Sequence, residues 1–169
     1  SLGDPLTGFA NRFGLLDTLN HSGTWQHGTF LLLDIDRFQN LNDSLGPRFG
    51  DDLLVAFSQR LLHALRPNDV TARLGSDEFG ILLPHTDEEG AILVAQRLRK
   101  SLEHPFIIQG SKLAVTVSIG ILSILESYST PDAMLRDADL ALHHAKSLGE
   151  SSIAVFDPAL RDELLARVA

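Results

Sequence analysis

The first residues whose types could do chemistry are the neighbouring acids Asp77 and Glu78. They follow a Gly75-Ser76 turn signal and precede the strand-like residues 79–83, which predicts that they lie at the tip of a hairpin. Adjacent carboxylates repel each other. Either they lie in solvent, or a cation or a cationic transition state lies against them.

A second pair of acids, Asp34 and Asp36, stands at the end of the apolar run 28–36. Residues two apart in a strand project to the same face. Carboxylates at the end of a buried strand can hold Mg²⁺, which takes carboxylate and phosphate oxygens. A solvated strand end or a helix cap is the alternative. The segment lacks the glycine and glutamate of an EF-hand loop, and the chain has no G-x-x-x-x-G-K-[ST] phosphate loop.

The elements that must position these acids alternate between helices and strands. Apolar spacing, caps and breakers predict both kinds of element, with Thr86 and Thr130 as N-caps of two helices. The stretch 36–50 is expected to be a short helical turn and a loop. Because hairpins lie between helices, we expect an α/β fold with a mostly antiparallel central sheet flanked by helices. The predicted helices span about 11–20, 50–67, 86–105, 130–149 and 158–169; the predicted strands span 28–36, 70–74, 78–84, two segments within 106–122, and 151–157.

The composition limits the classes of function. The 169 residues fit one domain with a core of its own. A net charge of −8 argues against a non-specific nucleic-acid binder. The absence of cysteine excludes thiolate chemistry and suggests a reducing compartment. Its apolar runs are too short to span a bilayer, so no membrane contact is expected, and its abrupt ends fit an excised piece of something longer.

Five segments in sequence order resemble the GGDEF domain, the catalytic module of diguanylate cyclases, which join two GTP into cyclic di-GMP. The resemblance extends over nearly the whole chain and implies the palm-like fold of nucleotidyl cyclases. The segments are DPLTGFANRFGLLDTL (4–19), LLLDIDRFQNLNDSLGPRFGDDLL (31–54), ARLGSDEF (72–79), VTVSIGI (115–121) and DADLALHHAKSLG (137–149).

The resemblance implies a metal-dependent role for the acids. Asp34, Asp77 and the carbonyl of Ile35 would hold two divalent cations, Mg²⁺ or Mn²⁺, on the GTP phosphates, and Asp77 and Glu78 would be the catalytic acids. The metal would lower the pKa of the attacking 3′-hydroxyl, which displaces pyrophosphate. Gly75, Ser76 and Lys146 match phosphate-contacting positions of the family.

Asn42 and Asp51 match the guanine-contacting residues of the family. An amide and a carboxylate complement the guanine edge and would be left unpaired by adenine. From the residues alone, a turn Asn and a helix N-cap Asp are the favoured explanation, because both residue types are typical of those positions.

Four positions depart from the family pattern. Ser76 replaces the second Gly of the signature, Gln39 replaces a Lys, Glu150 replaces an Arg and Pro47 replaces a His. Each lost charge-assisted phosphate bond costs about 1.5–3 kcal/mol, so two lost cations predict roughly a hundredfold loss in affinity or rate. We expect GTP and Mg²⁺ binding with low or absent cyclase activity. The alternative is an inactive regulatory module that senses GTP or cyclic di-GMP.

A second site is predicted at Arg66 and Asp69, which form an R-x-x-D pattern at the offset where many family members bind cyclic di-GMP as an allosteric product. The guanidinium would pair with the phosphates and stack on guanine, and the carboxylate would accept from guanine. An Arg at a helix C-terminus and an Asp in a turn are the alternative.

The remaining expectations concern the larger protein. Residues 1–157 are expected to form the GGDEF domain, and 158–169 a linker helix with an apolar stripe, leading to a covalently linked EAL phosphodiesterase domain; a C-terminal helix that packs on its own domain is the alternative. The resemblance implies a homodimer for activity and a cytoplasmic location, either free or as the cytoplasmic part of a membrane-anchored sensor.

Overall fold

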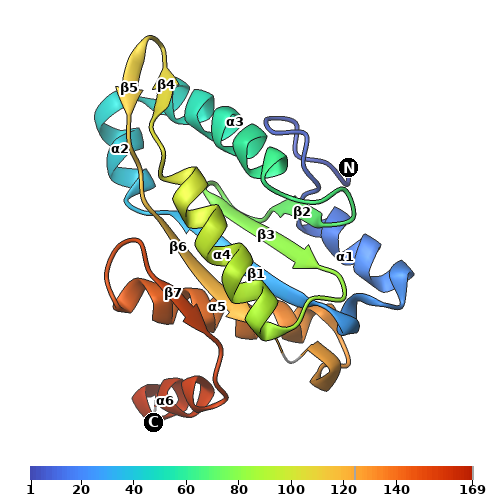
Figure 1. Cartoon of the computed structure of the whole chain (residues 1–169). Helices are drawn as coiled ribbons and strands as arrows, with labels where there is room; N and C mark the ends of the chain where they lie inside the picture. The colour runs from blue at the N-terminus through green and yellow to red at the C-terminus, as the bar shows by residue number, and fades with distance from the viewer. Residues whose placement is uncertain (124, 169) are drawn as a thin grey trace.

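A central five-stranded sheet organises the computed structural model, which describes residues 1–123 and 125–168. The strand order is β2-β3-β1-β6-β7 (Figure 1). Neighbouring strands are antiparallel except β6 and β7, which are parallel, so the predicted mostly antiparallel sheet is confirmed. The strands are β1 (Thr29–Ile35), β2 (Val70–Arg73), β3 (Glu78–Leu83), β6 (Val117–Leu122) and β7 (Ile153–Val155).

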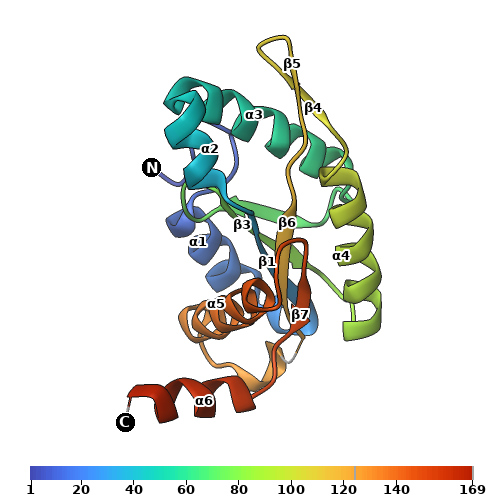
Figure 2. The same cartoon turned by 90° about the vertical axis from the view of Figure 1, so that its left-hand side faces the viewer.

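Helices cover both faces of the sheet. One face packs against α3 (Pro47–His63) and α4 (Glu88–Leu102), and the other against α1 (Arg12–Ser22) and α5 (Pro131–Ser147), as Figure 2 shows. The short helix α2 (Phe38–Leu45) leads into α3, and α6 (Ala159–Val168) lies against α5. Short 3₁₀ turns, η1 (Trp25–His27) and η2 (Leu125–Ser127), complete these elements.

The central strand β1 is buried along its whole length. Alternate residues of a strand project to opposite faces. Accordingly Leu31 and Leu33 enter the core under α3 and α4, whereas Phe30 and Leu32 enter the core under α1 and α5. A strand covered on both faces has few positions for polar side chains, so the carboxylate of Asp34 near its end is a costly exception.

The segment 106–122 contains three strands, not the predicted two. β4 (Phe106–Ile108) and β5 (Ser111–Leu113) form a separate hairpin, and β6 enters the central sheet. The hairpin closes at Gln109 and Gly110, with φ of 51° and 80°. Two successive left-handed residues match the twist of a two-residue hairpin, which explains why the pairing ends there.

Two helix starts differ from prediction. α3 begins at Pro47 rather than near residue 50, because proline is favoured in the first turn of a helix, and α2 is a helix of two turns. The N-cap of α4 is Asp87, whose carboxylate accepts from the N–H of Gly90, rather than Thr86. Thr130 caps α5 as predicted.

Within the described residues, no helix has the length and apolar character needed to cross a bilayer.

Candidate functional site

The two acidic pairs converge where β1 ends and β3 begins. The two strands run antiparallel and place Asp34 directly opposite Glu78. The hairpin between β2 and β3 carries Asp77 to the same place. Its turn is closed by backbone N–H groups of Leu74 and Gly75, which donate to the carbonyl of Glu78 at 2.8 and 3.4 Å. Sequence predicted both acids at a hairpin tip; strand register brings them to Asp34.

Burial dominates the electrostatics of these acids. The side chain of Asp34 is 5% exposed, and burial raises its pKa to about 6 even though Lys146 forms an ion pair with its Oδ2. Burial, followed by the charges of Asp139 and Asp34, raises the pKa of Glu78 to about 6. Burial also raises the pKa of Asp77. Within the described residues, the group therefore has more carboxylates than the charges of Lys146 and Arg73 offset.

A divalent cation fits this group. In the described part of the chain, Oδ1 of Asp34 is buried and has no hydrogen-bond partner. Two carboxylates, from Asp34 and Asp77, and the carbonyl of Ile35 are hard oxygen donors of the kind that Mg²⁺ takes together with phosphate oxygens. Among residues 1–123 and 125–168, no three His, Asp or Glu side chains are grouped for a metal ion, and the predicted set contains only two side chains.

Asp36 is not free to bind a metal. Its carboxylate accepts from the hydroxyls of Thr116 and Ser118 at 2.7 and 2.6 Å and from the N–H of Ser151 at 2.8 Å. It therefore ties the end of β1 to the turn after α5. Only Asp34 of the Asp34 and Asp36 pair keeps an unpartnered oxygen within the described residues.

Arg73, the last residue of β2, braces the hairpin between β2 and β3. Its guanidinium donates to the carbonyl of Ser76 and pairs with Asp4 at 3.1 Å. Partial burial opposes ionisation of Asp4, but hydrogen bonds from Thr7 and the charge of Arg73 leave its pKa lowered. Sequence reasoning missed this brace, although Asp4 begins a segment that resembles the family.

The predicted guanine-contacting residues lie on two helices that pack together. Asn42 is on α2 and Asp51 on α3, and a Cβ added to Gly50 would lie 2.2 Å from Oδ1 of Asn42. The amide of Asn42 therefore lies against the backbone just before Asp51. The break at Gly46, with a φ of 92°, folds α2 back on α3 and makes this contact.

The two residues of the second predicted site form an ion pair, with a guanidinium nitrogen of Arg66 3.7 Å from Oδ1 of Asp69. Arg66 lines a cavity of about 430 Å³ together with Arg97, which sequence reasoning missed. The side chain of Asp69 is 2% exposed; it accepts from the N–H of Arg66 at 2.8 Å and does not line the cavity. Helical spacing placed Arg97 on α4 but could not show that α4 passes beside Arg66.

A comparison with known families identifies the family to which the chain belongs. A family model described as "Diguanylate cyclase, GGDEF domain" matches residues 1–152. The chain belongs to the GGDEF family. The resemblance of the five segments is thereby confirmed, and so is the place of the chain in a family of cyclic di-GMP signalling.

Two curated relatives show the range of GGDEF-containing proteins. "Probable diguanylate cyclase DgcE" of Escherichia coli is 36% identical over 163 residues, covering 92% of this chain and 15% of DgcE. "Cyclic di-GMP phosphodiesterase NbdA" of Pseudomonas aeruginosa is 35% identical over 130 residues, covering 77% of this chain and 17% of NbdA. The chain thus spans only a small part of both relatives.

A solved structure of a GGDEF domain confirms the fold. The isolated GGDEF domain of TpbB, also called YfiN, from Pseudomonas aeruginosa matches with a TM-score of 0.88 at 32% identity. The match covers 96% of this chain and 99% of that one. The predicted α/β fold of the family is therefore correct.

Three of the four positions that the sequence predicts to depart from the family pattern make local side-chain contacts. Ser76 does not have a positive φ, so its backbone does not require glycine. Its hydroxyl donates to Oδ1 of Asp77 at 3.1 Å, and the side-chain amide of Gln39 donates to Asp43 at 2.9 Å. Glu150 forms an ion pair with Arg37 at 3.5 Å. At position 76, therefore, serine differs from glycine in the bulk and the hydroxyl of its side chain and not in the backbone angles that it needs.

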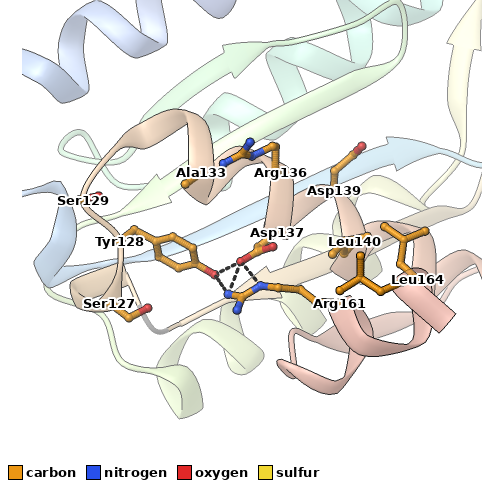
Figure 3. A pocket seen from close by; sticks show the side chains of 11 residues that line it. Ser127, Tyr128, Ser129, Ala133, Arg136, Asp137, Asp139, Leu140, Arg161 and Leu164 are labelled. Carbon is orange, nitrogen blue, oxygen red and sulfur yellow. Dashed lines mark hydrogen bonds and ion pairs between the residues drawn. The ribbon is translucent and has the colours of Figure 1, made fainter. Parts of the chain in front are cut away.

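The C-terminal helix reaches toward the acidic site. A cavity of about 290 Å³ is lined by Glu78 and Lys146 of the site and by Leu164 of α6. A larger cavity of about 670 Å³ lies beside it, where Arg161 of α6 hydrogen-bonds to Asp137 of α5 and to the hydroxyl of Tyr128 (Figure 3). No motif in the sequence indicated this cluster, because its three members come from separate segments.

Proposed function

We propose that this GGDEF domain binds GTP with Mg²⁺ or Mn²⁺ and converts it to cyclic di-GMP slowly or not at all. The observation that carries the proposal is the unpartnered, buried Oδ1 of Asp34 beside Asp77 and Glu78. A buried carboxylate oxygen without a donor is costly unless a ligand completes it. A divalent cation carried by a triphosphate would supply that partner.

Each residue of the acidic site would have a separate role in binding GTP and the metal. Asp34, Asp77 and the Ile35 carbonyl would hold the metal, which when bound would offset phosphate charge and acidify the 3′-hydroxyl. Lys146 would exchange part of its contact with Asp34 for a phosphate, and Gly75 and Ser76 would present the hairpin backbone to the triphosphate. Glu78 would share the acidic pocket with Asp77. A full turnover joins two GTP and releases two pyrophosphates, so the proposal requires a homodimer with one GTP per subunit.

Guanine recognition would come from Asn42 and Asp51. Their proximity supports the pairing of an amide and a carboxylate with one base edge. Adenine would leave the carboxylate without a donor, and that mismatch is the basis of selectivity for GTP. Since GTP is a nucleotide of the cytoplasm, the proposed reaction places the domain there.

We expect low turnover because this chain lacks two cations that the family places near the GTP phosphates. Gln39 is engaged by Asp43, and Glu150 adds a carboxylate where phosphate needs a cation. Loss of two charge-assisted contacts costs about 3–6 kcal/mol, which is a hundredfold or more in affinity or rate. Base and metal contacts do not depend on these positions, so we expect binding to persist better than catalysis.

A regulatory module is the second candidate function. The cavity between Arg66 and Arg97 supports it, because two guanidiniums at one cavity suit the phosphates of cyclic di-GMP. Similarity to part of a cyclic di-GMP phosphodiesterase, NbdA, is compatible with the same idea. In this proposal residues 1–157 form the sensor, and 158–169 link it to an EAL phosphodiesterase domain, whose activity the bound nucleotide would shift.

One experiment separates the two candidates. The purified domain at high concentration is incubated with GTP and Mg²⁺, chromatography measures cyclic di-GMP, and calorimetry on the same sample measures GTP binding. Steady product formation supports the cyclase. Binding heat without product supports a domain that binds GTP without turnover. Loss of cyclic di-GMP binding in Arg66→Ala and Arg97→Ala, but not in the matched control Arg12→Ala, would support the sensor and assign its second site. Absence of both heat and product contradicts the proposal.

A further inference from the structure

Three contacts tie the end of β1 to the end of α5. Asp34 pairs with Lys146, the carboxylate of Asp36 accepts from the N–H of Ser151, and Arg37 pairs with Glu150. The two segments, 34–37 and 146–151, therefore face each other along their length. The pair of Arg37 and Glu150 is the last of these contacts. Arg37 is three residues after Asp34 in the chain.

The backbone on both sides of the Arg37–Glu150 pair is held in an unusual conformation. Arg37 has a φ of 58° and Ser151 a φ of 56°, both in the left-handed region that favours glycine. Ser151 is fixed by three side chains: Asp36 accepts from its N–H, Glu103 accepts from its hydroxyl and Arg99 donates to its carbonyl. Strained residues persist where surrounding contacts over-determine them. Positions 37 and 150 are thus presented at a defined place.

The pair itself is much weaker than the contact beside it. The side chains of Arg37 and Glu150 are 70% and 52% exposed, whereas Asp34 is almost fully buried. Exposed ion pairs are screened by solvent and exchange partners readily. A guanidinium presents a planar fork of donors that matches phosphate oxygens better than it matches a single carboxylate oxygen at 3.5 Å.

We propose that Arg37 is a phosphate-binding residue of the nucleotide site and that Glu150 occupies it until a triphosphate displaces the carboxylate. The inference rests on the proposed function, since it concerns the same site. Arg37 thereby supplies a cation near the phosphates, and Glu150 lowers affinity by competition as well as by repulsion. The chain therefore has a cation for a triphosphate contact, but without nucleotide this cation is paired with a carboxylate.

A double-mutant cycle tests this pairing. Calorimetry with GTP and Mg²⁺ compares the wild type, Arg37→Gln, Glu150→Gln and the double variant. We expect Glu150→Gln to tighten binding by about three- to tenfold and Arg37→Gln to weaken it by about tenfold. In the Arg37→Gln background, Glu150→Gln should give a clearly smaller gain, because only the repulsion is relieved and the cation that it would release is gone.

Two controls make the test specific. Arg12 and Asp132 form another exposed ion pair, at 3.9 Å between α1 and α5, so Arg12→Gln and Asp132→Asn change net charge equally and should not change affinity. The gain from Glu150→Gln should also disappear with guanosine, which has no phosphate. Thermal melting confirms that all variants are folded.

The outcomes separate this inference from the proposed function. An equal gain from Glu150→Gln with and without Arg37 would show general repulsion and overturn the role of Arg37. Unchanged affinity in Arg37→Gln overturns it as well. Absence of GTP binding in all four proteins would overturn the proposed function and this inference together.

Discussion

Helix α5 carries two ionic clusters that are paired in opposite ways. Near its middle, Asp137 accepts from Tyr128 and from two nitrogens of Arg161, so its charge is met by several donors. At its end, Lys146 meets Asp34, whose second oxygen has no partner within the described residues, while Asp77 and Glu78 add further acids nearby. The first cluster is complete without a ligand, and the second is not.

The difference indicates what each cluster does. Removing a donor from a buried, paired charge destabilises the fold, because it leaves the charge uncompensated. A buried acidic group with too few cations destabilises the isolated chain and gains from a bound cation. Disrupting the first cluster should therefore reduce stability, and disrupting the second should reduce binding.

The largest effect is expected for Asp34→Asn. It should weaken Mg²⁺-dependent GTP binding by about a hundredfold or more, because the carboxylate proposed to hold the metal is lost. Calorimetry with and without Mg²⁺ measures this loss. The unfolding free energy at pH 7 should not fall, because burial already disfavours the charged carboxylate of Asp34.

Cyclic di-GMP binding distinguishes a local effect of Asp34→Asn from a general one. It should be unchanged in this variant, because Arg66 and Arg97 lie at another cavity. Asp17→Asn on α1 serves as the control for loss of an exposed carboxylate. If both ligands lost affinity in a folded Asp34→Asn protein, the assignment of two separate sites would be wrong.

The next largest effect should come from Arg161→Ala, which breaks the paired cluster. Among the described residues, Asp137 would keep Tyr128 as its side-chain partner. We expect a loss of about 1–2 kcal/mol in unfolding free energy, because the guanidinium is half exposed. Denaturant unfolding measures the loss, and hydrogen exchange over 159–168 reports release of α6. GTP affinity should not change.

Arg167→Ala is the matched control for this variant, since it removes a guanidinium from the same helix outside the cluster. It should have less than half the effect on stability. A tenfold loss of GTP affinity in Arg161→Ala would instead show that α6 acts on the site through the cavity that Leu164 shares with Glu78 and Lys146.

Ser76→Gly should increase the difference between the two clusters, because Asp77 in the acidic site loses a hydrogen-bond donor. It removes the hydroxyl that donates to Asp77, and it removes the Cβ from the hairpin. We expect about a two- to fivefold gain in Mg²⁺-dependent GTP affinity, corresponding to one hydrogen bond. Ser76→Ala isolates the hydroxyl from the Cβ, and no gain in either variant would show that Ser76 does not obstruct binding.

The smallest effect concerns Tyr128 at high pH. Burial, and then its hydrogen bond to Asp137, raises the pKa of Tyr128 to about 12. Between pH 10 and 12 the tyrosine would ionise mainly in the unfolded chain, so the wild type should lose stability as the pH rises. Tyr128→Phe should be slightly less stable at pH 8 and lack this part of the decline. Denaturant unfolding at pH 8, 10 and 11 compares them, and parallel curves would contradict the expectation.

Local sequence signals predicted much of the fold. The apolar run before Asp34, the turn at Gly75 and Ser76 and the cap at Thr130 each act over a few residues, so the residues alone determine them. The errors fell where a local signal had an equal competitor, as at Thr86 and Asp87 or within 106–122. There the outcome depended on which neighbour each segment met.

The candidate site shows the same division. Sequence placed Asp34, Asp77 and Lys146 on their elements, and the resemblance of five segments identified the family. Sequence could not pair Lys146 with Asp34 or Arg37 with Glu150, which are separated by more than a hundred residues. Nor could it show that Asp69 is covered or that Arg97 lines a cavity with Arg66.

The sequence by itself therefore determined the elements, the acids at the strand end and hairpin tip, and the membership of the GGDEF family. Only the tertiary structure decided which charges meet and which are left without a partner. The physical reason is that a carboxylate's pKa and its need for a ligand depend on burial and on charges within a few ångströms. Those neighbours are set by strand register and helix packing across distant parts of the chain.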